Sequence, residues 1–264
     1  MIILAQLSDT HVLAHGEEFP CGVDHNRQLD AAVEAINAEP RQPVGVLATG
    51  DLTNSGLKTQ MSELTTRLDQ LSAPVLAIPG NHDNQADFRS TFNMPWDSAE
   101  HLSWSVEIDE LRILGLDVTV PGEDYAIFDE AREQWLRDRL QEDPARPTAI
   151  AMHQPPFLTG IEWMDSTAIS NRDRFIATLS DFSCVSRIFC GHLHRPVQTT
   201  VGHVTASVGI STIYHVALDL TEGSSVQLIR DPAGYQLHCW LEGQWVSHTR
   251  YIGRSESAFT PKRR

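Results

Sequence analysis

The sequence predicts an α/β protein, and two patterns carry that prediction. Over roughly the first 190 residues, short apolar runs typical of buried strands alternate with segments whose apolar residues recur every three or four positions, as on one face of a helix. Beyond residue 197 the pattern changes to short strands in succession. The 264 residues, 41% hydrophobic and 21% charged, suffice for one main domain with a small appendage. We therefore expect a main domain at 1–220 and a β-rich extension at 221–264.

Alternating strands and helices open the chain. The expected strands lie at 2–7, 44–48 and 74–78, and the expected helices at 24–36 and 57–71. In the first helix Leu29, Val33 and Ile36 share one face, which is the spacing of an amphipathic helix packed on a core. Each of the three strands is followed directly by polar residues. Because parallel strands in open α/β sheets present their carboxyl ends at one edge, binding sites are found there.

The rest of the chain continues this alternation and then consists of strands. A short helix is expected at 88–96, a hairpin at 103–108 and 112–116, further helices at 130–141 and 171–179, and buried strands at 148–152 and 185–189. Short strands are then expected at 197–201, 204–208, 213–220, 225–230, 235–241 and 245–251. The extension would cover a sheet edge, form a lid or make a dimer contact, and the polar end at 254–264 is expected to fray.

Composition limits the classes of partner. A net charge of -15 argues against a nucleic-acid partner, because such binding requires many Lys and Arg residues at phosphates. No run approaches the roughly 20 apolar residues of a membrane span, and residues 1–7 lack a basic leader, so we expect a cytoplasmic protein without a membrane partner. The four cysteines show no metal-type spacing and are expected to be reduced packing residues.

Five strand ends carry residue types that bind transition metals. Leaving His82 aside, they are Asp9, His11, Asp51, Asn81, His153, His192 and His194. This mixed oxygen and nitrogen set without a thiolate suits Mn, Fe, Co or Zn, and it contains too many imidazoles for a Ca or Mg site. Seven ligands exceed the needs of one tetrahedral ion. The economical arrangement is two ions that share the carboxylate of Asp51.

Each of these residues also has a structural explanation on its own. Asp9 and Asp51 would serve as helix caps or turn formers, Asn81 as a turn residue, and His153 as a hydrogen-bonded loop histidine. A single His-x-His motif is equally weak evidence. The occurrence of all five groups, in order and at strand ends, disfavours a purely structural explanation. His15 and His25, in the loop after Asp9, are candidates to line the pocket.

The order of these motifs identifies a family. Asp-x-His, Gly-Asp, Gly-Asn-His-Asp, His-x-Pro-Pro and Gly-His-x-His follow one another between Asp9 and His194. They resemble the five motifs of the calcineurin-like metallophosphoesterase superfamily. The opening segment 3–11 and the late segment 243–247 are most similar to those of the bacterial class III cyclic-nucleotide and glycerophosphodiester phosphodiesterases.

The resemblance implies a fold and a site. The fold would be a four-layer αββα sandwich, two sheets flanked by helices, with two divalent or mixed-valence transition-metal ions at one end. The ligands of one ion would be Asp9, His11, Asp51 and His194, and those of the other Asp51, Asn81, His153 and His192. Catalysis would involve Asp51 and His82, the latter pointing at the phosphate and leaving group. Substrate contacts would come from Asn81, His82, Asn54 and His215.

The expected function is the hydrolysis of small phosphodiesters, such as cyclic AMP or glycerophosphodiesters. Two ions about 3.5–4 Å apart would lower the pKa of a bound water to about 7, orient the phosphoryl oxygen and neutralise charge. His82 would stabilise or protonate the leaving oxygen, a step typically worth about 10²- to 10⁴-fold. A phosphomonoesterase, a nucleotide pyrophosphohydrolase and a non-enzymatic scaffold stay open as alternatives. The expected partner is the small substrate, and a homo-oligomer is left open.

Overall fold

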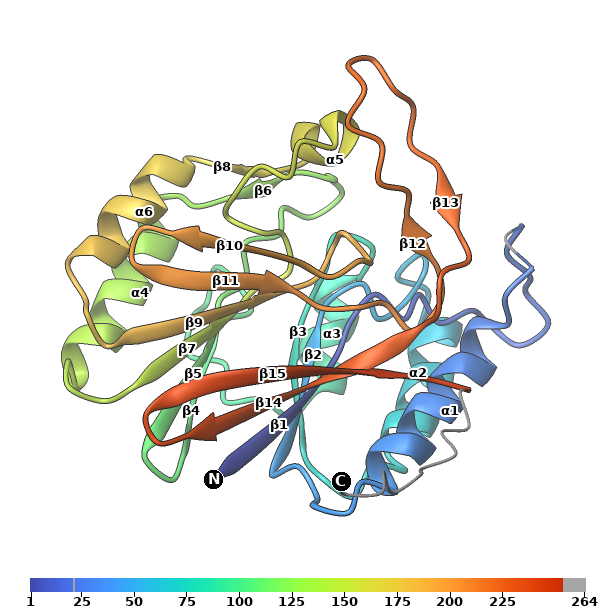
Figure 1. The fold of residues 1–264 in the computed structure, drawn as a ribbon, viewed down its shortest axis with the longest axis horizontal. Helices are drawn as coiled ribbons and strands as arrows, with labels where there is room; N and C mark the ends of the chain where they lie inside the picture. Colours follow the sequence, from blue (N-terminus) through green and yellow to red (C-terminus); the bar gives the residue numbers. More distant parts are fainter. Residues whose placement is uncertain (21, 254–264) are drawn as a thin grey trace, which may run out of the picture.

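Two β-sheets form the centre of the protein (Figure 1), whose computed structural model describes residues 1–20 and 22–253. The five-stranded sheet contains, in spatial order, β15 (Gln244–Tyr251), β14 (Gly234–Leu241), β1 (Ile2–Leu7), β2 (Gly45–Thr49) and β3 (Val75–Ile78). The six-stranded sheet contains β10 (Val197–Val201), β11 (Val204–Val208), β9 (Val185–Cys190), β7 (Thr148–Ala151), β5 (Leu111–Gly115) and β4 (Trp104–Ile108).

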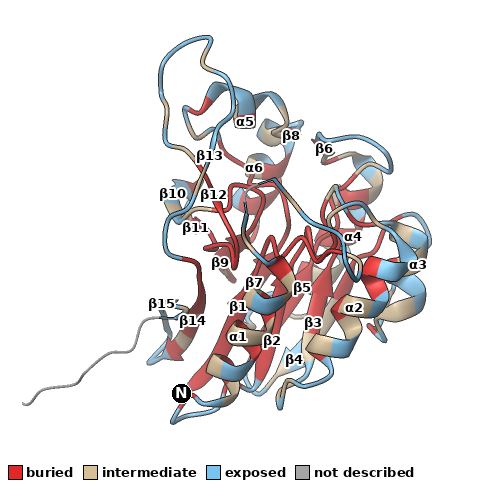
Figure 2. Cartoon of the chain, turned by 90° about the vertical axis from the view of Figure 1, so that its right-hand side faces the viewer, coloured by how far each residue is buried: buried red, intermediate tan, exposed pale blue. Residues whose placement is uncertain are grey.

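Helices and short elements surround these sheets. The helices are α1 (His25–Asn37), α2 (Lys58–Leu68), α3 (Gln85–Thr91), α4 (Glu130–Glu142), α5 (Glu162–Ser166) and α6 (Arg172–Ser180). Two pairs of two-residue strands, β6 (Ala126–Ile127) with β8 (Ile169–Ser170) and β12 (His215–Val216) with β13 (Leu228–Ile229), complete the described elements. Figure 2 shows the inner strands β1, β2, β5 and β7 buried and the outward sides of α1, α2 and α3 exposed.

Three hydrophobic cores define four layers. One core joins α1 and α2 to the outer face of the five-stranded sheet, with Leu29 and Leu64 packed near Val46. A second joins α4 and α6 to the six-stranded sheet, and a third, including Leu47 and Phe189, lies between the two sheets. Burial of apolar side chains on both faces of each sheet stabilises this stack, at roughly 25 cal/mol per Å² of apolar area. The predicted α/β sandwich, with sheets flanked by helices, is confirmed.

The parallel strands bring their carboxyl ends to one edge of the molecule. β1, β2 and β3 pair in parallel in one sheet, and β7 and β9 pair in parallel in the other. Backbone hydrogen bonds then join the loops that follow them. Asp9 N donates to Gly50 O at 3.1 Å, and Gly191 N donates to His153 O at 2.9 Å. The loops after four strands therefore meet at one place, as the sequence predicts.

The final hairpin completes the first sheet. β14 pairs antiparallel with β1, in register from Ile2 opposite Trp240 to Gln6 opposite Gln236, and β15 forms the edge beyond it. This hairpin thus lies along the β1 edge of the sheet, and the lid and dimer roles expected of the extension stay predictions. The division of the chain at residue 220 stays a prediction. The tail at 254–264 and Cys21 lie outside the described residues.

Two predicted strands are mostly wrong. The segments 213–220 and 225–230 contain only the two-residue strands β12 and β13. Leu218 and Leu220, at the end of the first segment, are 60% and 64% exposed. Within the described residues β12 and β13 pair only with each other, so neither of the two main sheets extends the strand pattern along these segments. Conversely, sequence analysis missed β6, α5 and β8, which are too short to show a periodic pattern.

Other expectations concern the membrane and the cysteines. Within the described residues, no helix is both long and apolar enough to cross a bilayer. The three described cysteines, Cys184, Cys190 and Cys239, are unpaired. The first two are buried, as expected of packing residues.

Candidate metal centre

The predicted strand-end residues come together in three overlapping groups. The groups of potential ligand atoms, each within 4.8 Å of one another, are Asp9 with His11 and His194, His11 with Asp51 and His82, and Asp51 with His153 and His192. Asn81 lines the same cavity as five of these residues. The structure therefore brings all seven predicted ligands to one end of the sheets. Asp51 belongs to two of the groups, which suits a bridging carboxylate.

Buried imidazole nitrogens lack hydrogen-bond partners that would satisfy them. His153 Nδ1 lies 2.8 Å from the Thr49 carbonyl, which can only accept, so the proton is on Nδ1. Its Nε2 is buried without a hydrogen bond, 3.2 Å from Asp51 Oδ2. His194 Nδ1 lies 3.1 Å from the Tyr214 carbonyl, and its Nε2 lies 3.1 Å from His11 Nε2. Buried imidazole nitrogens that face one another and the carboxylate of Asp51 at these distances fit a site for cations.

The backbone of the candidate ligands is strained. Eight non-glycine residues have positive φ within the described part of the chain. Five of them are candidate ligands: Asp9 (52°), His11 (39°), Asp51 (50°), His192 (75°) and His194 (57°). Left-handed conformations of such residues persist only where the surrounding structure enforces them, and they concentrate at functional sites. The turns thus direct side chains inward at a cost that ordinary loops avoid.

Two glycines allow the loops to approach. A Cβ on Gly191 would lie 2.6 Å from the Thr49 carbonyl oxygen and would also clash with the Ser8 hydroxyl. A Cβ on Gly80 would clash with the carboxylate and main chain of Asp51. The approach at Gly80 joins the loops after β3 and β2, and that at Gly191 brings the His192 loop to the Asp9 loop, where His192 N donates to Asp9 Oδ1 at 2.9 Å.

Electrostatic coupling shifts the pKa of several groups. Burial, reinforced by Asp51, raises the pKa of Asp9 to about 7 despite the attraction of His153. Burial alone would raise the pKa of Asp51, but the attraction of His153 outweighs it and the pKa falls. Burial would lower the pKa of His153, yet Asp51 and Asp9 raise it to about 9. Burial lowers the pKa of His192 and His194 to about 3. Neutral imidazoles and ionised carboxylates bind metal ions, so Asp51, His192 and His194 are already in that form, whereas Asp9 and His153 would release a proton when a metal ion binds.

His82 lies at the edge of this cluster and is 41% exposed. Its main-chain N donates to Asp51 Oδ1 at 2.9 Å, and its Nδ1 lies 2.7 Å from the Asn54 carbonyl. Its Nε2 is 4.0 Å from Asp51 Oδ2. Burial would lower the pKa of His82, but Asp51 and the Asn54 carbonyl raise it. The imidazole is therefore held with its Nε2 toward the candidate ligands and can carry a proton there.

Asp83 joins two of the loops, a role that the sequence analysis did not assign. Its carboxylate accepts hydrogen bonds from Leu52 N at 3.1 Å, Thr53 N at 2.8 Å, Thr53 Oγ1 at 2.7 Å and Gly80 N at 2.9 Å. It thereby ties the loop after β2 to the loop after β3. Its position in the Gly-Asn-His-Asp motif was the available signal.

A cavity of about 330 Å³ opens onto the cluster. Candidate ligands and His82 form part of its lining. The other lining residues come from α5, β12 and β13 and their surroundings, and they are Asp124, Trp163, Met164, Thr167, Tyr214, Val216, Val226 and Leu228. Polar candidate ligands and mainly apolar side chains therefore line the same cavity.

Four further predicted residues do not line this cavity. Asn54 contributes its main-chain carbonyl to His82, while its side chain donates to Ser55 Oγ at 3.2 Å. His215 is buried with Nδ1 3.9 Å from Asp231 Oδ2. His25 is buried behind His11 and bonds the carbonyl of that residue at 2.7 Å. His15 lines a separate pocket. Substrate contacts by Asn54 and His215 stay predictions.

Comparison with known proteins decides the family. The family model described as calcineurin-like phosphoesterase matches residues 3–196, well over half of the chain. The chain belongs to the calcineurin-like phosphoesterase family. The matched segment contains all seven candidate ligands and His82. The family resemblance expected from the five motifs is confirmed.

Relatives within this family are named as phosphodiesterases, which are hydrolases. A probable glycerophosphodiester phosphodiesterase of Arcobacter nitrofigilis is 32% identical over 98% of this chain and 96% of its own length. A probable cyclic nucleotide phosphodiesterase of Rhodococcus erythropolis is 32% identical over 83% and 74% of the two chains. A 3',5'-cyclic adenosine monophosphate phosphodiesterase of Escherichia coli is 29% identical over 74% and 70%.

Solved structures of two phosphatases share the fold. A dimetal phosphatase from Danio rerio superimposes with a TM-score of 0.70 at 13% identity, covering 95% of this chain and 96% of that one. A purple acid phosphatase from yellow lupin gives a TM-score of 0.69 at 12% identity, covering 95% of this chain and 51% of that one. At such identities the likeness establishes the common fold alone.

Proposed function

We propose that this protein is a metal-dependent phosphodiesterase that hydrolyses small diesters, either cyclic nucleotides such as cyclic AMP or glycerophosphodiesters. The observation that carries the proposal is the set of three overlapping groups of aspartate and histidine side chains beside a cavity. The names of the relatives, which include both kinds of phosphodiesterase, support the choice of substrate class.

Two ions would be held by residues of both sheets. The proposed ligands are Asp9, His11, Asp51 and His194 for one ion, and Asp51, Asn81, His153 and His192 for the other. Donors of this type favour Mn, Fe, Co or Zn. When bound, two such ions supply positive charge against the phosphoryl oxygens and a nucleophile at neutral pH. The strained turns of the chain hold the ligand side chains in place before any ion or substrate arrives.

His82 would act on the leaving group. Its Nδ1 proton is held by the Asn54 carbonyl, so Nε2 is the nitrogen that can deliver a second proton into the cavity. A proton delivered from Nε2 to the leaving oxygen would prevent the release of an unstable alkoxide. Asn81, beside it, would orient both the second ion and the substrate.

The cavity favours a small substrate. Its volume is about 330 Å³, and its described lining residues include no lysine or arginine. A nucleic-acid strand is bound through many cationic contacts, which the net charge of -15 also disfavours. We therefore infer a small-molecule partner and no membrane or nucleic-acid partner.

We also propose that the protein is located in the cytoplasm, which cell fractionation would test. Whether it forms a homo-oligomer is left open, and light scattering would determine its oligomeric state.

The proposal is tested with purified protein that is stripped with a chelator and reconstituted with Mn²⁺ or Co²⁺. Its rates would be measured on an aryl phosphodiester, the matching monoester, cyclic AMP and glycerophosphocholine. We expect hydrolysis of the aryl diester and of at least one natural diester, with little monoester hydrolysis. A preference for the monoester, or for a nucleotide pyrophosphate added to the panel, would contradict the proposal. Metal content well below one equivalent per chain, together with no activity, would favour a scaffold.

A further inference from the structure

In three candidate ligand histidines, one ring nitrogen lies within hydrogen-bond distance of a protein group outside the ligand set, so the other ring nitrogen can bind a metal ion. His153 and His194 each place Nδ1 against a main-chain carbonyl, which fixes the proton on that nitrogen. His192 differs, because its Nε2 lies 2.9 Å from the side-chain hydroxyl of Thr167. A hydroxyl can donate or accept, so the tautomer of His192 depends on what else Thr167 contacts.

The second contact of Thr167 settles the direction of this hydrogen bond. Thr167 Oγ1 also lies 2.9 Å from the Met164 carbonyl, to which it donates its single proton. Both hydrogen bonds are made together only if His192 Nε2 carries a proton and donates it to Thr167. The one ring nitrogen of His192 with an available lone pair is then Nδ1.

We propose that Thr167 is a positioning residue that holds His192 in the Nε2-protonated tautomer and so presents Nδ1 to a metal ion. This inference rests on the proposed metal centre. Unlike the carbonyls that orient His153 and His194, this partner is a side chain and can be removed by substitution. Partners of this kind fix ring orientation, and their loss typically weakens metal binding about 10- to 100-fold.

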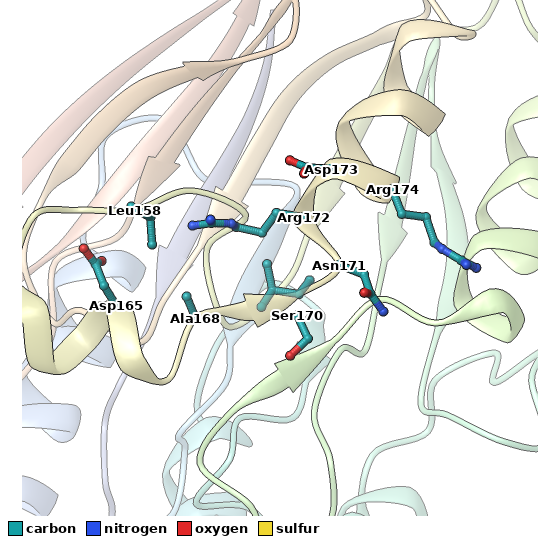
Figure 3. A pocket seen from close by; sticks show the side chains of 9 residues that line it. Leu158, Asp165, Ala168, Ser170, Asn171, Arg172, Asp173 and Arg174 are labelled. Atoms are coloured by element: carbon teal, nitrogen blue, oxygen red, sulfur yellow. The ribbon is translucent and has the colours of Figure 1, made fainter.

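The position of Thr167 depends on the short helix α5, at whose carboxyl end it lies. The carboxylate of Asp165 anchors this helix by accepting from Thr159 N at 2.7 Å, Thr159 Oγ1 at 2.9 Å and Gly160 N at 2.9 Å. Figure 3 shows Asp165 and Ala168 beside a second cavity, of about 550 Å³, on this part of the chain. Because α5 borders this cavity on one side, its position is held by the hydrogen bonds of Asp165 and by the buried side chain of Met164.

Three variants separate this role from a structural one. Thr167→Val removes the hydroxyl at nearly constant shape, Thr167→Ser keeps it, and Ser166→Ala is the matched control. Ser166 Oγ donates to the Trp163 carbonyl at 2.6 Å, so its loss removes the same kind of helix-terminal hydrogen bond. We expect T167V to bind one of two Mn²⁺ ions about 10- to 100-fold more weakly by calorimetric titration. We expect T167S and S166A to match the wild type.

A spectroscopic measurement tests the inference without a substitution at Thr167. In the Zn²⁺-loaded protein, ¹⁵N chemical shifts of the histidine rings, with the His192 signal assigned through His192→Gln, should show a protonated Nε2 and a metal-bound Nδ1. A metal-bound Nε2 of His192 would overturn the inference. This result does not depend on whether T167V folds, because the spectrum is measured without a substitution at Thr167. Equal Mn²⁺ affinities in T167V and wild type would overturn it too. A wild type that binds fewer than two ions would instead contradict the proposed metal centre on which it rests.

Discussion

The candidate ligands combine backbone strain with side-chain burial. Asp9, His11, Asp51, His192 and His194 all have positive φ and all are buried. Each such conformation costs on the order of 1–3 kcal/mol, so the fold must hold these turns with bonds such as that from His192 N to Asp9. Ions that bind only the folded chain would offset part of that cost.

Removal of the shared carboxylate should affect both ions. We expect Asp51→Ala to lose metal and diesterase activity together, because Asp51 would contact each ion and because its Oδ1 accepts from His82 N. Metal analysis by mass spectrometry and the diester assay check this. Asp69→Ala, at an exposed helix end, is the control and should keep both properties. Two tightly bound ions in the Asp51 variant would argue against a bridging role.

Removal of His82 should separate metal binding from rate. His82→Ala leaves all seven proposed ligands in place but deletes the proton donor in the cavity. We expect full metal content and a fall in kcat of about 10²- to 10⁴-fold. Steady-state kinetics on cyclic AMP or glycerophosphocholine, with metal content measured on the same sample, checks this. An unchanged kcat would remove His82 from the mechanism.

At the scale of elements, one glutamine links strands of both sheets beneath the site. Gln6 on β1 donates from Nε2 to Thr49 Oγ1 at 2.8 Å and to the Cys190 carbonyl at 2.9 Å. Thr49 ends β2 just before Gly50 and Asp51, and Cys190 ends β9 just before Gly191 and His192. This buried amide therefore sets the spacing between two loops that carry Asp51 and His192, two of the four ligands of the proposed second ion.

The close approach of these loops makes Gly191 sensitive to substitution. In Gly191→Ala the new methyl group would meet the Thr49 carbonyl and the Ser8 hydroxyl, so a loop must shift. We expect a loss of roughly 1–3 kcal/mol in the free energy of unfolding, as for other overpacked sites, and a large loss of metal affinity. Gly45→Ala, whose methyl would meet Leu4 and Leu76 at an ordinary 3.5 Å, is the control for urea unfolding. Equal stability losses in the two variants would contradict this account.

Across the whole molecule, the interface between the sheets contains a neutral histidine. His238 on β14 lies 2.9 Å from Gln6 Oε1 through Nε2 and 2.8 Å from Ser247 Oγ through Nδ1. Because Gln6 Oε1 can only accept, Nε2 carries the proton and Nδ1 accepts from the serine hydroxyl. The ring also packs on Phe189, at 4.1 Å between centroids. The C-terminal hairpin is thereby joined to the residue that spaces the site loops.

This histidine predicts acid sensitivity of the fold. Burial, followed by the charges of Arg187 and His248, lowers the pKa of His238 from 6.5 to about 3. Its contribution to stability is therefore complete above pH 6.5 and is lost as the pH falls toward 3, because the unfolded chain binds the proton more readily. One such group gives a slope of about 1.4 kcal/mol per pH unit. Urea unfolding between pH 7 and 4 should show a shallower slope for His238→Gln than for wild type.

The exposed His203 provides the control for this measurement. It lies in the turn between β10 and β11, and His203→Gln should leave the slope unchanged. If His238→Gln and wild type have the same slope, the neutral His238 does not contribute to the acid response.

Local pattern predicted the layers and the site ligands, whereas long-range partners were not predictable. The apolar runs before Asp9, Asp51 and His153 marked strands, and polar residues directly after strands pointed to one shared edge. The pairing of β14 with β1 was not visible, because a strand pattern does not specify its neighbour. Thr167 was missed for the same reason, because its partner His192 lies 25 residues further along the chain. The helix that ends just before Thr167 has only five residues and shows no periodic pattern.

The central claim, a two-ion centre that cleaves small diesters, is tested most directly by titrating chelator-treated protein with Mn²⁺ while its rate on cyclic AMP and glycerophosphocholine is followed. The account predicts no rate without metal and a rate on at least one diester that rises until two equivalents per chain are bound. A rate that is independent of added metal, or that is complete at one equivalent, would contradict it.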